Sequence, residues 1–96
     1  MKVEIEHSAK LELKKAYEYI RKRSYQNAEK VKAKILQSIK ALSRHPEMHP
    51  PDKYCLDNDG KFRAYEIYSY RITYYTGENK IIVLRIRHTK MNPVNY

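Results

Sequence analysis

The spacing of apolar residues predicts one short strand followed by two amphipathic helices. Over residues 2–7 apolar and polar side chains alternate, with Val3 and Ile5 on one side, which is typical of an edge strand. Apolar residues then recur at steps of three and four, as they do along one face of an α-helix. The first helix is expected to have Ser8 as its N-cap and to run to about Arg23.

A second helix is predicted directly after the first, beginning at Ser24 or Asn27. It is expected to end at Pro46, because the residue before a proline disfavours helical backbone. Its buried stripe is expected to consist of Ala28, Val31, Ile35, Ile39 and Leu42. Two such helices joined by a tight link form an antiparallel hairpin, and their apolar faces favour packing on the same sheet.

Residues 44–60 interrupt this regular pattern. They hold three of the four prolines and the turn sequence DNDG, so an irregular connection is expected. After it the apolar period changes to two, and the last two strands are joined by a Gly-containing turn at residues 77–79. Short connections favour antiparallel neighbours, which predicts a meander of three strands over residues 62–68, 70–76 and 80–88.

The whole pattern predicts one α+β domain over residues 1–96 with the element order β-α-α-β-β-β. The helical hairpin is expected to pack on one face of a small, twisted, mainly antiparallel sheet, which leaves the other face available. Alternation gives the last strand one side with Ile82, Leu84, Ile86 and His88 and another side with Ile81, Val83, Arg85 and Arg87. If the helices cover the apolar sides, Arg71, Arg85 and Arg87 converge on the uncovered face.

The charge balance indicates which class of partner this domain binds. The chain has 20 Lys and Arg residues against 11 Asp and Glu residues, and its formal net charge is +9. Such a surplus attracts polyanions and acidic proteins and speeds association with them. We therefore expect the partner to be a nucleic acid, a nucleoprotein particle or an acidic protein.

Composition also excludes several classes of protein. Cys55 is the only cysteine, so no intramolecular disulfide can form, and a reducing compartment is expected. No apolar run approaches a membrane span and the first residues are too polar for a signal peptide, which favours a cytoplasmic protein without a membrane partner. His45 and His49 have the spacing of helical metal ligands, but Pro46 and Pro50 argue against a helix there. Neither a metal nor another cofactor is predicted.

The C-terminal sequence LRIRHTKMNPVNY places two arginines, a histidine, a lysine and a final tyrosine around the end of an apolar strand. With the order β-α-α-β-β-β, the YRI of residues 70–72 and the RIRH of residues 85–88, the chain resembles the RelE/ParE superfamily. These proteins are the toxins of bacterial type II toxin–antitoxin pairs, and the likeness covers nearly the whole chain. It implies one of two activities: RelE-like toxins cleave mRNA on the ribosome, whereas ParE-like toxins poison DNA gyrase and are not nucleases.

The RelE-like branch implies a set of site residues in this sequence. Arg71 matches the arginine of that branch's "YR" strand, which contacts the scissile phosphate, and Lys90 matches a basic residue after the final strand. Tyr96 falls at the position of a C-terminal catalytic tyrosine, and His88 resembles a histidine that some relatives use as acid or base. The tail HTKMNP and the position of Glu66 depart from the nuclease pattern. The residues expected to bind nucleic acid or a partner are Lys61, Arg63, Arg85 and Arg87.

Metal-free cleavage of RNA by its own 2′-OH has three chemical requirements. One group takes the hydroxyl proton, cations stabilise the transition state, and another group protonates the leaving oxygen. Guanidinium groups suit the second role, and His88 titrates near neutrality and suits the first or third. Tyr96 can act as a base only if cations such as Arg71 or Lys90 lower its pKa from the ordinary value of about 10.

Each of these residues also has a purely structural interpretation. The arginines of the last strand fit its solvated side, and His88 fits a hydrogen-bonded strand end. Tyr96 fits a frayed terminus. Arg71 fits a charge pair with Glu66 on the neighbouring strand.

The favoured function is a toxin that cleaves mRNA on the ribosome through Arg71, His88, Lys90 and Tyr96. The alternative is a non-catalytic inhibitor of DNA gyrase, and a third hypothesis is a binding module without toxicity. A toxin of this kind is expected to form a hetero-oligomer with a cognate antitoxin whose binding segment folds onto its surface. Its other expected partners are the ribosome with mRNA or, in the alternative, DNA gyrase.

Overall fold

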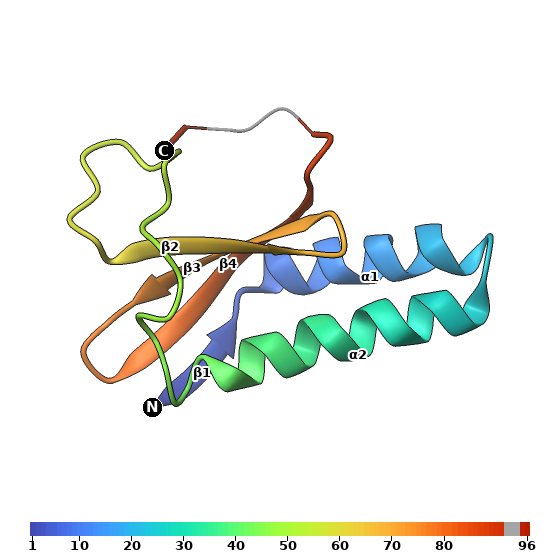
Figure 1. The fold of residues 1–96 in the computed structure, drawn as a ribbon, viewed down its shortest axis with the longest axis horizontal. Helices are drawn as coiled ribbons and strands as arrows, with labels where there is room; N and C mark the ends of the chain where they lie inside the picture. The colour runs from blue at the N-terminus through green and yellow to red at the C-terminus, as the bar shows by residue number, and fades with distance from the viewer. Residues whose placement is uncertain (92–94) are drawn as a thin grey trace.

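The computed structural model describes residues 1–91, 95 and 96, and its elements follow the predicted order (Figure 1). They are β1 (Lys2–Ile5), α1 (His7–Arg21), α2 (Tyr25–Ala41), β2 (Phe62–Ile67), β3 (Tyr70–Thr76) and β4 (Lys80–His88). The predicted irregular connection between α2 and β2 contains a single β-bridge, between Pro51 and Arg63. The predicted α+β class is therefore confirmed.

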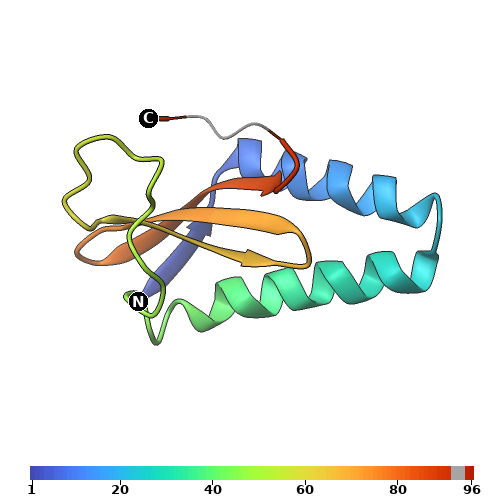
Figure 2. The same ribbon diagram turned by 45° about the horizontal axis from the view of Figure 1, so that its top comes forward.

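The strands form one sheet in the order β1-β4-β3-β2. β2, β3 and β4 make the predicted antiparallel meander, and β1 pairs parallel to β4 at one edge. The prediction of a mainly antiparallel sheet is thus confirmed. α1 and α2 lie side by side against the same face of this sheet (Figures 1 and 2). Neither of these helices, the two in the described residues, has the length and apolar character needed to cross a membrane.

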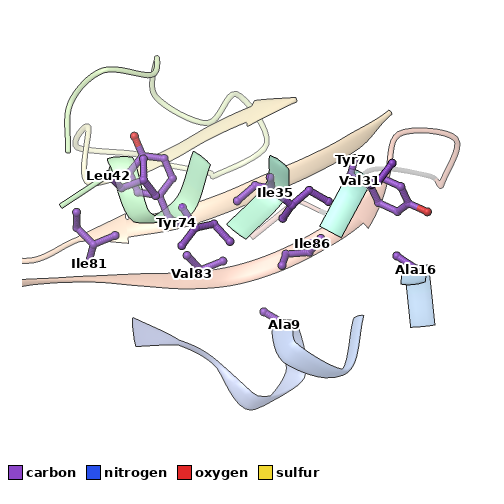
Figure 3. Packing of buried hydrophobic residues seen from close by; sticks show 12 residues of the cluster. Ala9, Ala16, Val31, Ile35, Leu42, Tyr70, Tyr74, Ile81, Val83 and Ile86 are labelled. Carbon is purple, nitrogen blue, oxygen red and sulfur yellow. The ribbon is translucent and has the colours of Figure 1, made fainter. Parts of the chain in front are cut away.

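The core lies between the hairpin and the sheet (Figure 3). Tyr74 is fully buried there, and its hydroxyl donates to the backbone oxygen of Pro46 at 2.9 Å. Because a buried hydroxyl needs a partner, this bond fixes the start of the irregular connection against the core. The fully buried aliphatic side chains come from both layers and include Ile35, Leu42, Ile72, Ile81 and Val83. Each contributes about 1.5–3 kcal/mol of hydrophobic stabilisation.

The helix starts match the prediction in one case and differ in the other. Ser8 is not an N-cap: it lies inside the first turn of α1, and the N-cap residue Glu6 makes no side-chain cap. The N–H of Glu6 donates instead to the carbonyl of Val83 at 2.9 Å, which continues the pairing of β1. Of the two predicted starts of the second helix, Ser24 and Asn27, Ser24 is the N-cap: its backbone is extended and its side chain accepts a hydrogen bond from the N–H of Asn27 at 3.1 Å.

β4 contains a bulge opposite the middle of β3. Thr73 pairs with Arg85, but the next residue, Tyr74, pairs with Val83, so Leu84 is an extra residue on β4. A bulge of this kind bends the strand and changes which alternate residues share a face.

Because of the bulge, the predicted division of the last strand into two sides is wrong. Ile81 and Val83 were expected to lie opposite Ile86, but all three are buried beneath the helices. After the bulge, Arg85 and Arg87 flank the buried Ile86, so both lie on the uncovered face, as predicted. The extra residue therefore keeps the apolar part of β4 in the core without turning its arginines inward.

Candidate functional site on the uncovered face of the sheet

Three arginine side chains gather on the uncovered face. Arg71 on β3 pairs directly with Arg87 on β4, and Arg85 lies two residues before Arg87 on the same side. They line a hollow of about 130 Å³ together with groups from outside the sheet, among them Asp52, Tyr54 and Tyr96. The predicted convergence of the three arginines is therefore present in the structure.

Asp52 is the buried centre of this hollow. Its side chain is 1% exposed and accepts hydrogen bonds from the Arg71 guanidinium at 2.7 Å and from the Tyr96 hydroxyl at 2.6 Å. The backbone N–H of Tyr54 donates a third bond at 3.0 Å. Burial by itself raises the pKa of Asp52, but the three hydrogen bonds outweigh it, and the pKa lies below its ordinary value. Asp52 is therefore a buried, ionised carboxylate.

Turn residues hold Asp52 in place against β2. The N–H of Asp52 donates to the carbonyl of Phe62 at 2.7 Å. The Asn58 side chain donates to the carbonyls of both residues, at 3.2 Å and 2.7 Å, and accepts from the N–H of Gly60 at 2.9 Å. Gly60 has a φ of 93°, a conformation that other residues rarely adopt. The DNDG turn thus builds the platform that carries the buried carboxylate.

Arg71 is enclosed by anionic and aromatic groups. Besides Asp52, Glu66 on β2 approaches its guanidinium at 3.4 Å, so the structural interpretation of Arg71 as a partner of Glu66 is correct. The guanidinium carbon also lies 4.9 Å from the centre of the Tyr54 ring. Its Nε–H is buried and has no acceptor among residues 1–91, 95 and 96. Two carboxylates therefore neutralise the positive charge of Arg71, which would be needed to bind a scissile phosphate.

Tyr96 is anchored rather than frayed. Its N–H donates to the carbonyl of Tyr54 at 3.0 Å, its carbonyl accepts from Leu56, and its ring meets the edge of the Phe62 ring at 5.5 Å. Burial and the hydrogen bond to Asp52 raise the pKa of Tyr96 well above its ordinary value, and the opposing effect of Arg71 is smaller. The condition for Tyr96 as a general base, a lowered pKa, is therefore not met.

His88 and Lys90 lie at the end of β4, at the boundary between two hollows. His88 lines the arginine hollow and also a larger one, of about 580 Å³, beside α1. Its ring contacts Tyr70 edge-on at 5.1 Å, and its Nδ1 accepts the N–H of Lys90 at 3.0 Å. Lys90 lines only the larger hollow. The structure thus brings Arg71, His88 and Tyr96 around one space and places Lys90 outside it.

Lys61 and Arg63 lie apart from the three arginines. Arg63 pairs with the buried Tyr74 on the helix-covered side of the sheet, and its guanidinium donates to the carbonyl of His49 at 2.6 Å. Lys61 is exposed before β2, with its ammonium 3.9 Å from Asp59. Neither residue lines the arginine hollow. The alternation of β2 explains this, because its neighbouring Ala64 and Glu66 share the face of Arg71 instead.

Glu12 is a site neighbour that sequence reasoning missed. β1 ends at Ile5, so the outer edge of β4 beyond Val83 has no strand partner there. Glu12 reaches from α1 to accept the N–H of Ile86 at 2.9 Å and lies 3.7 Å from the Arg85 guanidinium. Glu12 therefore accepts a hydrogen bond from an N–H at the open edge of β4 and offsets the charge of a second arginine, Arg85. Its position on α1 gave no signal of this role.

His49 of the irregular connection is explained by packing, whereas His45 is exposed. His49 stacks on the Tyr65 ring with centroids 4.0 Å apart, and burial lowers its pKa. No three His, Cys, Asp or Glu side chains among the described residues gather closely enough to hold a metal ion.

Comparison with known proteins identifies the family of this fold and site. The family model of the ParE toxin of the type II toxin–antitoxin system parDE matches residues 3–93. The chain belongs to the ParE toxin family. It is accordingly a type II toxin of the RelE/ParE superfamily, as the sequence resemblance indicated. No curated protein sequence matches the chain.

Solved structures share the fold at low sequence identity. The chromosomal ParDE toxin–antitoxin system of P. aeruginosa has a TM-score of 0.72 and 18% identity, over 92% of this chain and 95% of that one. The YoeB dimer of Staphylococcus aureus has a TM-score of 0.56 and 15% identity, over the same shares. The heterotetrameric YoeB–YefM toxin–antitoxin complex of the same organism has a TM-score of 0.54 and 15% identity, again over 92% and 95%.

Proposed function

We propose that this ParE-family toxin inhibits growth by binding DNA gyrase and does not cut RNA. The observation that carries the proposal is the Asp52 carboxylate, which binds both Arg71 and Tyr96. These are two of the four residues on which metal-free RNA cleavage would depend. The match to the ParE family over residues 3–93 also supports the gyrase-inhibiting branch over the nuclease branch.

The electrostatics of the site argue against nuclease chemistry. A phosphate approaching Arg71 would meet Asp52 and Glu66, and desolvating a phosphate beside two carboxylates is unfavourable. Tyr96 holds its proton against a buried anion, so it is a poor base near neutral pH. A protein surface that binds a partner requires neither an ionised tyrosine nor a free guanidinium.

We further propose that a cognate antitoxin neutralises the toxin. Solved structures with the same fold include a YoeB–YefM toxin–antitoxin complex. The Nε–H of Arg71 lacks an acceptor among the described residues, which costs about 1–3 kcal/mol and favours a partner that supplies one. The net charge of +9 favours a partner with acidic segments.

Ribosome-dependent mRNA cleavage is the second candidate. It is supported by the hollow of about 130 Å³ around which Arg71, Arg85, Arg87, His88 and Tyr96 meet. If ribosomal RNA or mRNA displaced Asp52 from Arg71, three guanidinium groups would face one phosphate. This candidate therefore needs a rearrangement of the Asp52 contacts on the ribosome.

Induction in a bacterial host separates the two candidates. The gyrase proposal predicts DNA breaks, filamentous cells and an unchanged mRNA pattern, and purified toxin should inhibit supercoiling by gyrase. The variant Tyr96→Phe should remain toxic, because it changes no group that the proposal uses chemically. Translation arrest with mRNA cut within codons, and normal growth of Tyr96→Phe, would instead establish the nuclease.

A further inference from the structure

The net positive charge of the protein is concentrated on the helical hairpin. Residues 7–44 carry eleven of the 20 Lys and Arg residues but only three of the 11 Asp and Glu residues. The rest of the chain, including the arginine hollow, holds nine basic and eight acidic residues and is nearly neutral. The charge that composition assigns to the whole chain is therefore almost entirely a property of two helices and their connections.

These eleven cations are exposed, and none forms an ion pair with a described residue. Cations elsewhere in the described chain do form ion pairs, among them Lys2, Lys61, Arg71, Lys80 and Arg85. Burying ion-paired cations against a partner would first require breaking those pairs. The hairpin offers unpaired charge that needs no such rearrangement.

The cations form two neighbouring rows on the hairpin. Lys10, Lys14 and Arg21 share one face of α1, because residues four and seven apart lie above one another on a helix. Lys32 on α2 lies 5.2 Å from the Tyr17 ring of α1, so the α2 row begins directly beside them. Lys40 continues this second row two turns further along α2.

A tyrosine–glutamate contact joins the rows. The Tyr17 hydroxyl of α1 donates a hydrogen bond to Glu29 of α2, and this bond, before other causes, raises the pKa of Tyr17 to about 12. Glu29 is thereby occupied by Tyr17 and does not pair with Lys32 or another hairpin cation. The contact holds the two helices together without reducing the cationic charge that they present.

We propose that the outer face of the α1–α2 hairpin binds the phosphate backbone of duplex DNA, without reading its sequence. Packed helices lie about 8–10 Å apart, which suits phosphates on both sides of a major groove about 12 Å wide. Helices of 15 and 17 residues cover about 22–26 Å, most of one turn of B-DNA. Lys and Arg contacts to phosphate carry affinity and no sequence information.

The surface favours DNA over the two other polyanions. An acidic peptide that folds on binding needs an apolar groove, and none of the five cations of the two rows lines either of the hollows described above. Duplex RNA has a deep, narrow major groove, so two rows about 10 Å apart match its backbone less well. This binding is independent of the arginine hollow and does not rest on inhibition of gyrase.

Salt-dependent binding of the full chain tests the proposal. Labelled DNA duplexes of unrelated sequence, about 24 base pairs long, are titrated with toxin between about 50 and 200 mM salt, and anisotropy is recorded. If five cations contact phosphates, log K should fall with log salt with a slope of about −4.5 and equally for each sequence. A duplex RNA of the same length and polyglutamate should bind at least tenfold more weakly.

Two variants with the same loss of charge localise the binding. The triple variant Lys10→Gln/Lys14→Gln/Arg21→Gln should reduce the slope by about 2.7 and weaken binding more than tenfold at low salt. The control variant Lys2→Gln/Lys61→Gln/Lys80→Gln should keep the wild-type slope. All these side chains are exposed, and circular dichroism checks that both variants fold. Equal weakening in both variants, or tighter binding of RNA or polyglutamate than of DNA, would overturn the proposal.

Discussion

Asp52 shows how one buried carboxylate determines what its neighbours can do. It fixes the Arg71 guanidinium, keeps Tyr96 protonated and ties both to the loop before β2. Removing either partner would leave a charged group buried with fewer hydrogen bonds, and such groups are costly. A loss of toxicity on substitution of Arg71 therefore does not by itself indicate catalysis, because folding is affected as well.

Arg71→Ala should lower the free energy of unfolding by about 3 kcal/mol, because it leaves Asp52 buried without its cation. Urea denaturation followed by circular dichroism measures this loss. The double variant Asp52→Asn/Arg71→Ala should be less destabilised than the sum of the two single variants, because its carboxylate no longer needs a cation. Additive losses would show that the pair contributes nothing specific to folding.

The same pair should make stability depend on pH in the acid range. The pKa of Asp52 is lower in the folded protein than in the unfolded chain, so its contribution is complete above the unfolded pKa of about 4. The contribution is lost as the pH falls through the lower, folded pKa. Wild type should therefore lose more free energy of unfolding than Asp52→Asn between about pH 5 and pH 2. Parallel curves from urea titrations at each pH would contradict this.

Single residues of the site were only partly predictable. Arg71, Arg85 and Arg87 were found because strand alternation assigns side chains to faces. Asp52 and Tyr54 lie in a connection without a repeating pattern, and no local rule indicates which sheet residue such a loop will meet. The sequence therefore predicted the position of Arg71 on the sheet but not its main partner, Asp52.

Among the elements, β4 shows where a regular period misleads. The first four residues of its sequence IIVLRIR are all apolar, so either set of alternate residues could face the core there, and the pattern alone does not reveal the bulge at Leu84. The packing of α1 and α2 determines which residues of β4 are buried, because Ile81, Val83 and Ile86 all fit beneath the two helices. The helices and strands themselves were predictable, since each has a strong period of its own.

The two serines near the helix starts provide a matched test of capping. Ser24→Ala should lower the free energy of unfolding by about 1 kcal/mol, because Ser24 accepts the N–H of Asn27 at the start of α2. Ser8→Ala should change it little or raise it slightly, because Ser8 lies inside α1 and alanine has the higher helix propensity. Thermal and urea denaturation of the two variants make the comparison, and equal effects would contradict the assigned caps.

At the scale of the whole molecule, the concentration of positive charge on the helical hairpin was not predictable from the net charge. The sequence gives a total of +9 and predicted that Arg71, Arg85 and Arg87 would gather on the uncovered face of the sheet. The structure pairs Arg71 with Asp52 and Glu66, and Arg85 with Glu12. The cations of the hairpin have no ion-pair partners among the described residues. The number of charges in a segment and their pairing in three dimensions together decide where a polyanion is attracted.

This concentration of charge predicts that salt stabilises the protein. Unpaired cations on one hairpin repel each other across distances shorter than the Debye length, which falls from about 30 Å at 0.01 M to about 10 Å at 0.1 M salt. Screening should relieve about 1 kcal/mol of repulsion, which raises Tm by about 4–8 °C in a domain of this size. Calorimetry of the full chain in increasing sodium chloride measures the change.

The variants that locate DNA binding also assign the source of this effect. Lys10→Gln/Lys14→Gln/Arg21→Gln should have a higher Tm than wild type at low salt and a smaller rise with salt, because part of the repulsion is already removed. Lys2→Gln/Lys61→Gln/Lys80→Gln removes exposed ion pairs instead, and such pairs contribute little to stability, so its salt response should stay close to that of wild type. A Tm that falls with salt in wild type would mean that ion pairs on the sheet outweigh repulsion on the hairpin. In that case the hairpin would not be the dominant electrostatic feature of the fold.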